Sequence, residues 1–152
     1  MRATKLCRFV SASPTNRHFW VTLPATAPPK RIWSLWTNVP NWRQWDTGLE
    51  SARANTPSGP GGTGEIVADG RTSTFTVIEY TTGKSYTIRT GLLGAALHVR
   101  RFLKDEKNTT TLTHEVWFSG PLAFIFAGLF GAKFRRLLPD VVAQVNQLAH
   151  AH

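Results

Sequence analysis

Cysteine, long apolar runs and blocks of like charge are all scarce in this chain, and each scarcity excludes a class of protein. Cys7 is the single cysteine in 152 residues, which excludes an internal disulfide framework and a cysteine-based zinc site. The longest apolar run, residues 121–132, is shorter than the roughly 20 residues that a membrane-spanning helix needs. The N-terminus has no apolar stretch of signal-peptide length, so we expect a cytoplasmic protein.

Basic residues are plentiful but dispersed. The net charge is +9, and outside the N-terminal region the basic residues occur at most in pairs, such as Arg100-Arg101 and Arg135-Arg136. No run of like charge is long enough to act as a nucleic-acid-binding arm. We therefore interpret the charge as a basic surface and expect no nucleic-acid partner.

Composition and patterning divide the chain into a flexible N-terminal arm, residues 1–17, and a single domain, residues 18–152. A short strand is predicted at residues 19–23, followed by a helix at residues 29–37 and a second short helix from Pro40. Alternating segments between turn residues then predict six strands, at residues 49–55, 64–68, 72–80, 84–92, 95–104 and 109–119.

The hydrophobic period changes at Gly120-Pro121. Before this point Leu112, His114 and Val116 share one face of a predicted strand, and after it the apolar residues recur at helical spacing through residues 122–150. The short loops predict antiparallel hairpins, because parallel strands would need helices between them. The fold class is therefore α+β: a curved antiparallel sheet of about seven strands around a long C-terminal helix, with two short helices after the first strand.

Five segments carry a resemblance to a known family. They are residues 32–36 (IWSLW), 39–46 (VPNWRQWD), the glycine-rich 59–64, 75–79 (FTVIE) and 118–122 (FSGPL). In this order they resemble the helix-grip fold of the START-like superfamily, specifically its polyketide cyclase/dehydrase family, over residues 19–149. The resemblance implies a hydrophobic ligand held between sheet and helix. Some members are cyclases or dehydratases, but no family-wide catalytic motif can be carried over.

The leading functional prediction is binding of a small hydrophobic molecule, a lipid or an aromatic polyketide, in a cavity between the sheet and the C-terminal helix. An open question is whether phenylalanine side chains of that helix fill the cavity. The residues predicted to line it are Trp45, Phe75, Val77, Tyr86, Ile88, Leu97, Val99, Leu112, His114, Val116, Phe126, Phe130 and Phe134.

An alternative prediction is an enzyme, a cyclase or dehydratase. His114 lies on the face assigned to the interior and would act as general base, while the Tyr86 hydroxyl would orient a substrate carbonyl. The structural alternative for His114 is a core histidine that is hydrogen-bonded to a neighbour. Arg101 falls on the same strand face as Leu97 and Val99, which indicates either a charge near the cavity mouth or a break in the register.

A third prediction is a peripheral membrane or partner-binding module. Phe124, Phe126 and Phe130 precede basic residues of the C-terminal helix, an arrangement that favours weak contact with an anionic membrane. The histidines lack metal-ligand spacing and residues 59–64 lack the lysine of a phosphate-binding loop, so we expect no metal and no cofactor. The assembly is expected to be a monomer or a homodimer.

Overall fold

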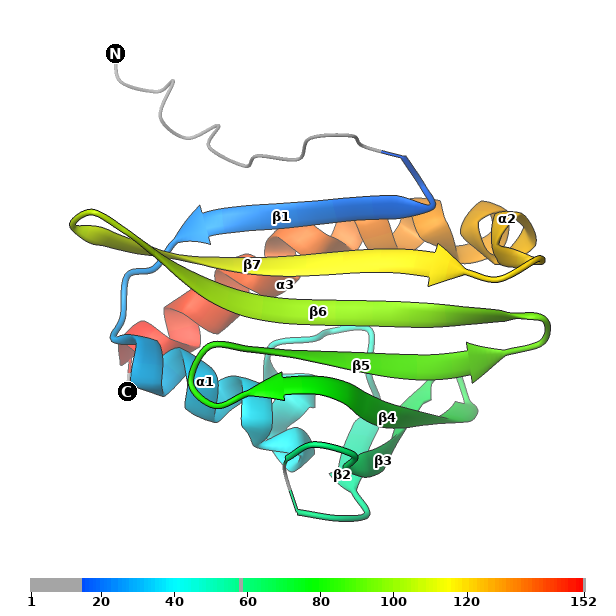
Figure 1. The fold of residues 1–152 in the computed structure, drawn as a ribbon, viewed down its shortest axis with the longest axis horizontal. Helices are drawn as coiled ribbons and strands as arrows, with labels where there is room; N and C mark the ends of the chain where they lie inside the picture. Colours follow the sequence, from blue (N-terminus) through cyan, green and yellow to red (C-terminus); the bar gives the residue numbers. More distant parts are fainter. Residues whose placement is uncertain (1–14, 58, 152) are drawn as a thin grey trace.

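Seven antiparallel strands form one curved sheet, and the C-terminal helix lies across one face of it (Figure 1). The computed structural model describes residues 15–57 and 59–151. The sheet order is β1-β7-β6-β5-β4-β3-β2, so every neighbouring pair from β2 to β7 is a hairpin or a direct succession, and only β1 joins out of sequence. The predicted α+β helix-grip architecture is confirmed.

The strands follow the predicted segments closely. They are β1 (His18–Pro24), β2 (Ser51–Ala54), β3 (Thr63–Ala68), β4 (Arg71–Thr81), β5 (Ser85–Leu92), β6 (Ala95–Glu106) and β7 (Thr109–Ser119). In the register, Val21 of β1 lies opposite His114 of β7, and His114 lies opposite Arg101 of β6. This register brings His114 and Arg101 to the same face of the sheet, the inner face that the C-terminal helix covers.

The helices are α1 (Pro29–Thr37), the 3-10 helix η2 (Val39–Gln44), α2 (Ala123–Phe126), the π-helix η3 (Ala127–Gly131) and α3 (Ala132–Ala151). Pro29 begins α1 as predicted, because the first turn of a helix leaves its N–H groups unpaired in any case. The predicted second short helix is a 3-10 helix. The predicted single helix of residues 122–150 is interrupted by π-helical residues, which apolar spacing alone does not reveal. No helix in the described ranges is long and apolar enough to cross a membrane.

Tryptophans and phenylalanines fill different parts of the space between the sheet and the C-terminal helix. Trp36, Trp42 and Trp45 are each at most 2% exposed. They pack with Val142 and Val145 of α3 in the main core. The phenylalanines of the C-terminal helix instead form a smaller cluster around Phe118, in which the rings of Phe126, Phe130 and Phe134 stack in series. Phenylalanine side chains therefore fill the space beneath α2 and η3, and the three tryptophans, from α1, η2 and the residue after η2, fill the space beneath α3.

Candidate functional site

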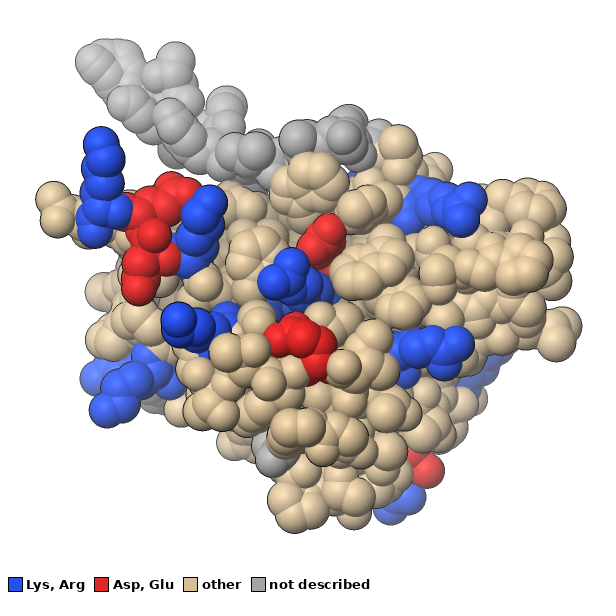
Figure 2. Space-filling view, in the orientation of Figure 1, with Lys and Arg blue, Asp and Glu red and all other residues tan. Residues whose placement is uncertain are grey.

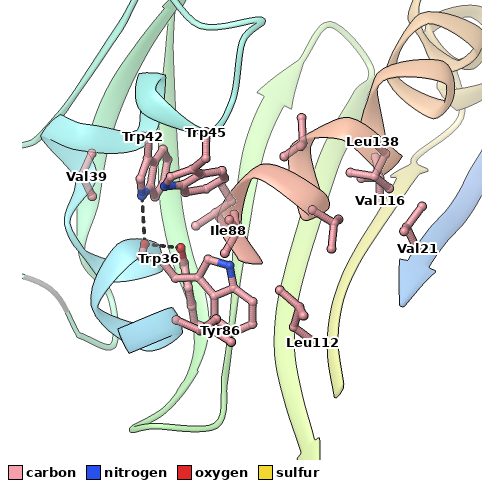
Figure 3. Packing of buried hydrophobic residues seen from close by; sticks show 14 of the residues in the cluster. Val21, Trp36, Val39, Trp42, Trp45, Tyr86, Ile88, Leu112, Val116 and Leu138 are labelled. Atoms are coloured by element: carbon pink, nitrogen blue, oxygen red, sulfur yellow. Dashed lines mark hydrogen bonds between the residues drawn. The ribbon is translucent and has the colours of Figure 1, made fainter. Parts of the chain in front are cut away.

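The carbonyl of Trp36 is the centre of a buried polar cluster. It lies in the last turn of α1, where carbonyl groups lose their helical partners, and the residue four positions on is Pro40, which has no N–H. Two side chains supply the missing donors: the indole N–H of Trp42 at 2.8 Å and the hydroxyl of Tyr86 at 2.5 Å. Both hydrogen bonds are visible in Figure 3. The end of α1 is thus tied to β5 and η2.

The indole N–H of Trp36 is also used. It donates to Nε2 of His114 at 3.0 Å, and the imidazole is 1% exposed. Burial lowers the pKa of His114 well below its ordinary value, and the charge of Arg101 lowers it further. The imidazole is therefore neutral, and because Nε2 accepts a hydrogen bond, the ring proton sits on Nδ1.

Arg101 continues the cluster into β6. Its Nη1 donates to the Tyr86 hydroxyl at 2.6 Å, so the hydroxyl accepts from the guanidinium and donates to the Trp36 carbonyl. Burial raises the pKa of Tyr86, an effect that the nearby Arg101 charge partly offsets. The Tyr86 hydroxyl therefore links the Arg101 guanidinium to the C-terminal end of α1.

The guanidinium of Arg101 is buried, with the residue only 4% exposed. It lies over three aromatic rings, at 4.7 Å from the Trp42 centroid, 4.9 Å from Trp45 and 5.5 Å from Tyr86. Among the described residues Arg101 has no carboxylate within the 4.0 Å of an ion pair. The sequence left Arg101 as a mouth charge or a register break, and the structure shows a third outcome, a cation enclosed by aromatic rings with the register intact.

A small cavity adjoins this cluster. Its volume is about 20 Å³, room for about one water molecule. Trp36, Trp42, Phe75, Val77 and Tyr86 line its inner part, and the outer part is lined by residues of β2 and of the loop before β3, including Ala54, Thr56, Pro57, Gly59 and Gly62. The glycine-rich loop of residues 59–64 therefore borders this cavity.

The mouth of the cavity is held in place by backbone hydrogen bonds. The amide of Val77 donates to the carbonyl of Gly62 at 2.7 Å, and the amide of Gly61 donates to the carbonyl of Val77 at 3.1 Å. Gly64 follows in β3, where a Cβ would collide with the ring of Phe75. Glycine at this position therefore leaves room for the Phe75 ring, which borders the cavity.

The predicted site residues divide into two groups. Trp45, which follows η2, and the predicted residues of the sheet belong to the main core: Phe75, Val77, Tyr86, Ile88, Leu97, Val99, Leu112, His114 and Val116. Phe126 and Phe130 belong to the smaller cluster, and Phe134 contacts both. Of the whole set, Phe75, Val77 and Tyr86 border the small cavity, together with Trp36, Trp42 and Tyr80, which the sequence did not single out as site residues.

The two predicted catalytic residues are brought together, but by a shared partner. His114 and Tyr86 both bind Trp36, one through its indole and the other through its carbonyl. A general base needs a free lone pair, and a substrate would have to displace the Trp36 indole before Nε2 of His114 could accept a proton. Within the described ranges, no three His, Cys, Asp or Glu side chains are grouped as a metal site requires.

A larger hollow, of about 630 Å³, lies on the other face of the sheet. It is open to solvent and its lining comes from β1, β6 and β7, with charged groups such as Lys104, Glu106 and Glu115. Its walls are more polar than those of the small cavity. We take the cavity beside the buried cluster as the candidate site, because the enclosed titratable side chains lie there.

A curved antiparallel sheet covered on one face by a long C-terminal helix is the architecture of START-like proteins of the helix-grip class. The sequence profile of one family in this class, described as polyketide cyclase/dehydrase and lipid transport, matches residues 17–149. This chain belongs to that family. Among curated proteins, no sequence matches it significantly.

Solved structures agree on the fold. Protein MLL2253 from Mesorhizobium loti superposes with a TM-score of 0.67 at 19% identity, over 87% of this chain and 96% of that chain. Ara h 8.0201 gives 0.66 at 10% identity, over 90% and 99%. DynU16, a protein of the dynemicin biosynthetic locus, gives 0.65 at 19% identity, over 88% of this chain and 47% of its own. At these identities the likeness concerns the fold alone.

Proposed function

We propose that this protein binds a small hydrophobic molecule, of lipid or aromatic-polyketide size, on the inner face of the sheet, in a cavity bordered by α1 and η2 rather than by the C-terminal helix. The observation that carries the proposal is the aromatic-lined cavity whose mouth is the loop of residues 59–62 and whose inner wall is Trp36, Trp42 and Phe75. Membership of a family whose description includes lipid transport supports it.

The cavity must open to admit such a ligand. Pockets for small molecules enclose roughly 300–1,000 Å³, whereas this one encloses about 20 Å³. The residues that would have to move are Trp42, on the short helix η2, and the loop that Val77 holds through two hydrogen bonds. A closed ground state reduces the apparent affinity by the fraction of molecules that are open.

A thermal-shift screen against fatty acids, sterols and polycyclic aromatics tests the proposal. Ala54→Trp should plug the mouth, because Ala54 borders the cavity from β2, and should abolish any ligand-induced rise in Tm. Ser51→Trp is the matched control, since Ser51 is exposed on the same strand and does not border the cavity. Absence of stabilisation by every ligand class, or equal stabilisation of the plugged variant, would reject binding in this cavity.

Contact with an anionic membrane is a second candidate, favoured by an apolar tip that we define as Leu93, Phe124, Ile125 and Leu129. The first two are 82% and 64% exposed, and Leu129 is 66% exposed. The β5–β6 turn packs on the start of α2, since the Leu122 amide donates to the Gly94 carbonyl at 2.9 Å. Figure 2 shows this end of the molecule as mostly uncharged surface.

Basic groups lie next to the apolar tip. Arg17 donates to the carbonyl of Phe118 at the end of β7, and Lys133, which follows the π-helix, forms an exposed ion pair with Asp69 at 3.1 Å. Exposed apolar side chains flanked by cations are typical of surfaces that insert into anionic lipid.

Sedimentation with neutral and anionic vesicles tests this candidate. We expect binding to anionic vesicles at low salt, weakened by Leu93→Asp and kept by Ile78→Asp, which changes an exposed apolar residue of β4 away from the tip. Equal sedimentation with both vesicle types would dispose of it.

A further inference from the structure

We propose that Arg101 and Trp45 form a binding site for the carboxylate of a hydrophobic acid. This inference rests on the proposed function and names the class of its ligand. The two side chains come from β6 and from the residue after η2, and they meet on the inner face of the sheet, where the Arg101 guanidinium lies 4.9 Å from the Trp45 ring centroid.

Arg101 and Trp45 both carry hydrogen-bond donors in a buried environment. A guanidinium carries five N–H donors and an indole carries one, and neither group has an acceptor. Among the described residues, Nε of Arg101 and Nε1 of Trp45 are both buried and both lack a hydrogen-bond partner. Buried donors are nearly always paired, so two unpaired donors on neighbouring side chains indicate an acceptor that belongs to a ligand.

The positive charge of Arg101 is surrounded by neutral groups. The groups that face the guanidinium are the rings of Trp42, Trp45 and Tyr86 and, through the Tyr86 hydroxyl, the carbonyl end of α1. These supply partial negative charge but no anion in contact. Asp46 is near enough for its pKa to be lowered by Arg101, yet burial raises that pKa by more, and its Oδ1 accepts from the Gly48 amide instead. The cation therefore lacks a counter-ion at contact distance.

Arg101 lies close to the small cavity, from which a ligand would reach it. Trp42 and Tyr86 border the small cavity and both contact Arg101, so the guanidinium is one side chain away from the open space. Phe75 and Val77 extend the apolar lining from there towards the loop at the mouth. A carboxylate at Arg101 and Trp45 would thus place an aliphatic or aromatic body along these residues.

The alternative is a purely structural role, in which the aromatic rings hold a cation that binds nothing else. A matched pair of ligands separates the two, because decanoic acid and 1-decanol share a tail and differ in the head group. Displacement of the neutral dye N-phenyl-1-naphthylamine, followed by fluorescence at about pH 8 where the acid is ionised, reports binding of each. We expect the wild type to prefer the acid by about tenfold or more.

Three substitutions test which side chain causes the preference for the acid over the alcohol. Arg101→Gln should lose the preference for the acid and retain binding of the alcohol. Arg100→Gln is the matched control: it removes the same charge from the adjacent residue, which lies opposite Glu115 with its guanidinium over the Phe102 ring, and it should keep the preference. Trp45→Phe, which removes one donor and keeps an aromatic ring, should reduce binding of the acid and leave binding of the alcohol unchanged. This variant provides the test if Arg101→Gln does not fold.

The outcomes are separable. If neither the acid nor the alcohol displaces the dye, the proposed function itself fails. If both bind with equal affinity, or if Trp45→Phe and Arg101→Gln keep the full preference, the ligand site stands and the carboxylate site is overturned. Repeating the comparison with 2-naphthoic acid and 2-naphthalenemethanol shows whether the acid that fits is aliphatic or aromatic.

Discussion

At the scale of single residues, Trp36 connects parts of the chain that are far apart in sequence. Its indole binds His114, 78 positions away, and its carbonyl binds Tyr86, 50 positions away. Both contacts satisfy buried polar groups, which is the condition for placing them in a core without a large energetic cost. Arg101 and Trp45, in contrast, keep unpaired donors in the same core. Residues that break a packing rule beside residues that obey it are typical of functional positions.

The neutral state of His114 predicts how stability depends on pH. The pKa of His114 lies below its value in the unfolded chain, so the unfolded state binds more protons below about pH 6.5. Stability is therefore full above that pH and is lost as the pH falls, with a slope of up to about 1.4 kcal/mol per pH unit. Urea unfolding at a series of pH values measures this slope.

Two variants test the assignment of this slope to His114. His114→Gln, whose amide oxygen can still accept from the Trp36 indole, should flatten the slope between about pH 6.5 and 5. Ser51→Gln, at an exposed site without an ionisable side chain, should keep the wild-type profile. An unchanged slope in His114→Gln would contradict the buried neutral imidazole.

At the scale of elements, the C-terminal helix is built from unequal parts. α3 buries Val141, Val142 and Val145 in the core, whereas α2 and the π-helix expose Phe124 and Leu129. A π-helical turn inside a longer helix is often found at functional sites. Three of the four residues of the apolar tip that we propose for membrane contact, Phe124, Ile125 and Leu129, lie on this part of the helix.

Two glycines of the π-helix predict opposite effects of the same substitution. A Cβ at Gly128 would meet nothing within 4 Å, so Gly128→Ala should leave stability unchanged or raise it by up to about 1 kcal/mol. A Cβ at Gly131 would collide with the backbone of Asn16, so Gly131→Ala should lower it. Chemical denaturation of the two variants makes the comparison, and equal effects would refute the close contact between Gly131 and the segment before β1.

At the scale of the whole molecule, positive charge is in excess. The net charge is +9, and ion pairs such as Arg53–Glu65 and Lys133–Asp69 are exposed, which makes each one weak. Repulsion among the remaining cations should destabilise the folded state at low ionic strength.

Salt should therefore stabilise this protein. Raising sodium chloride from about 20 to about 200 mM shortens the screening length and should raise the Tm by a few degrees. A scan in a non-chelating, monovalent buffer measures the effect, with a neutral osmolyte as the control for preferential exclusion. A Tm that falls with added salt would mean that attractive pairs outweigh the net repulsion.

The amino-acid sequence by itself determined the order and type of most elements, because the signals are local. β7 was predicted with its observed bounds, 109–119, since alternation and the Gly120-Pro121 break lie within one segment. α1 was predicted as observed from Pro29 and its apolar stripe. The inward position of His114 followed from the same alternation, because strand periodicity assigns a face without reference to other elements.

Only the tertiary structure decided what those inward residues contact. Alternation placed Arg101 on the inner face while its charge favoured solvent, and the conflict was resolved by Trp42 and Trp45, which come from another part of the chain. The partnership of Trp36 with His114 and Tyr86 likewise depends on how α1 docks on the sheet. Long-range packing and hydrogen bonding of this kind leave no periodic trace in sequence, since they depend on the relative positions of elements rather than on the pattern within one.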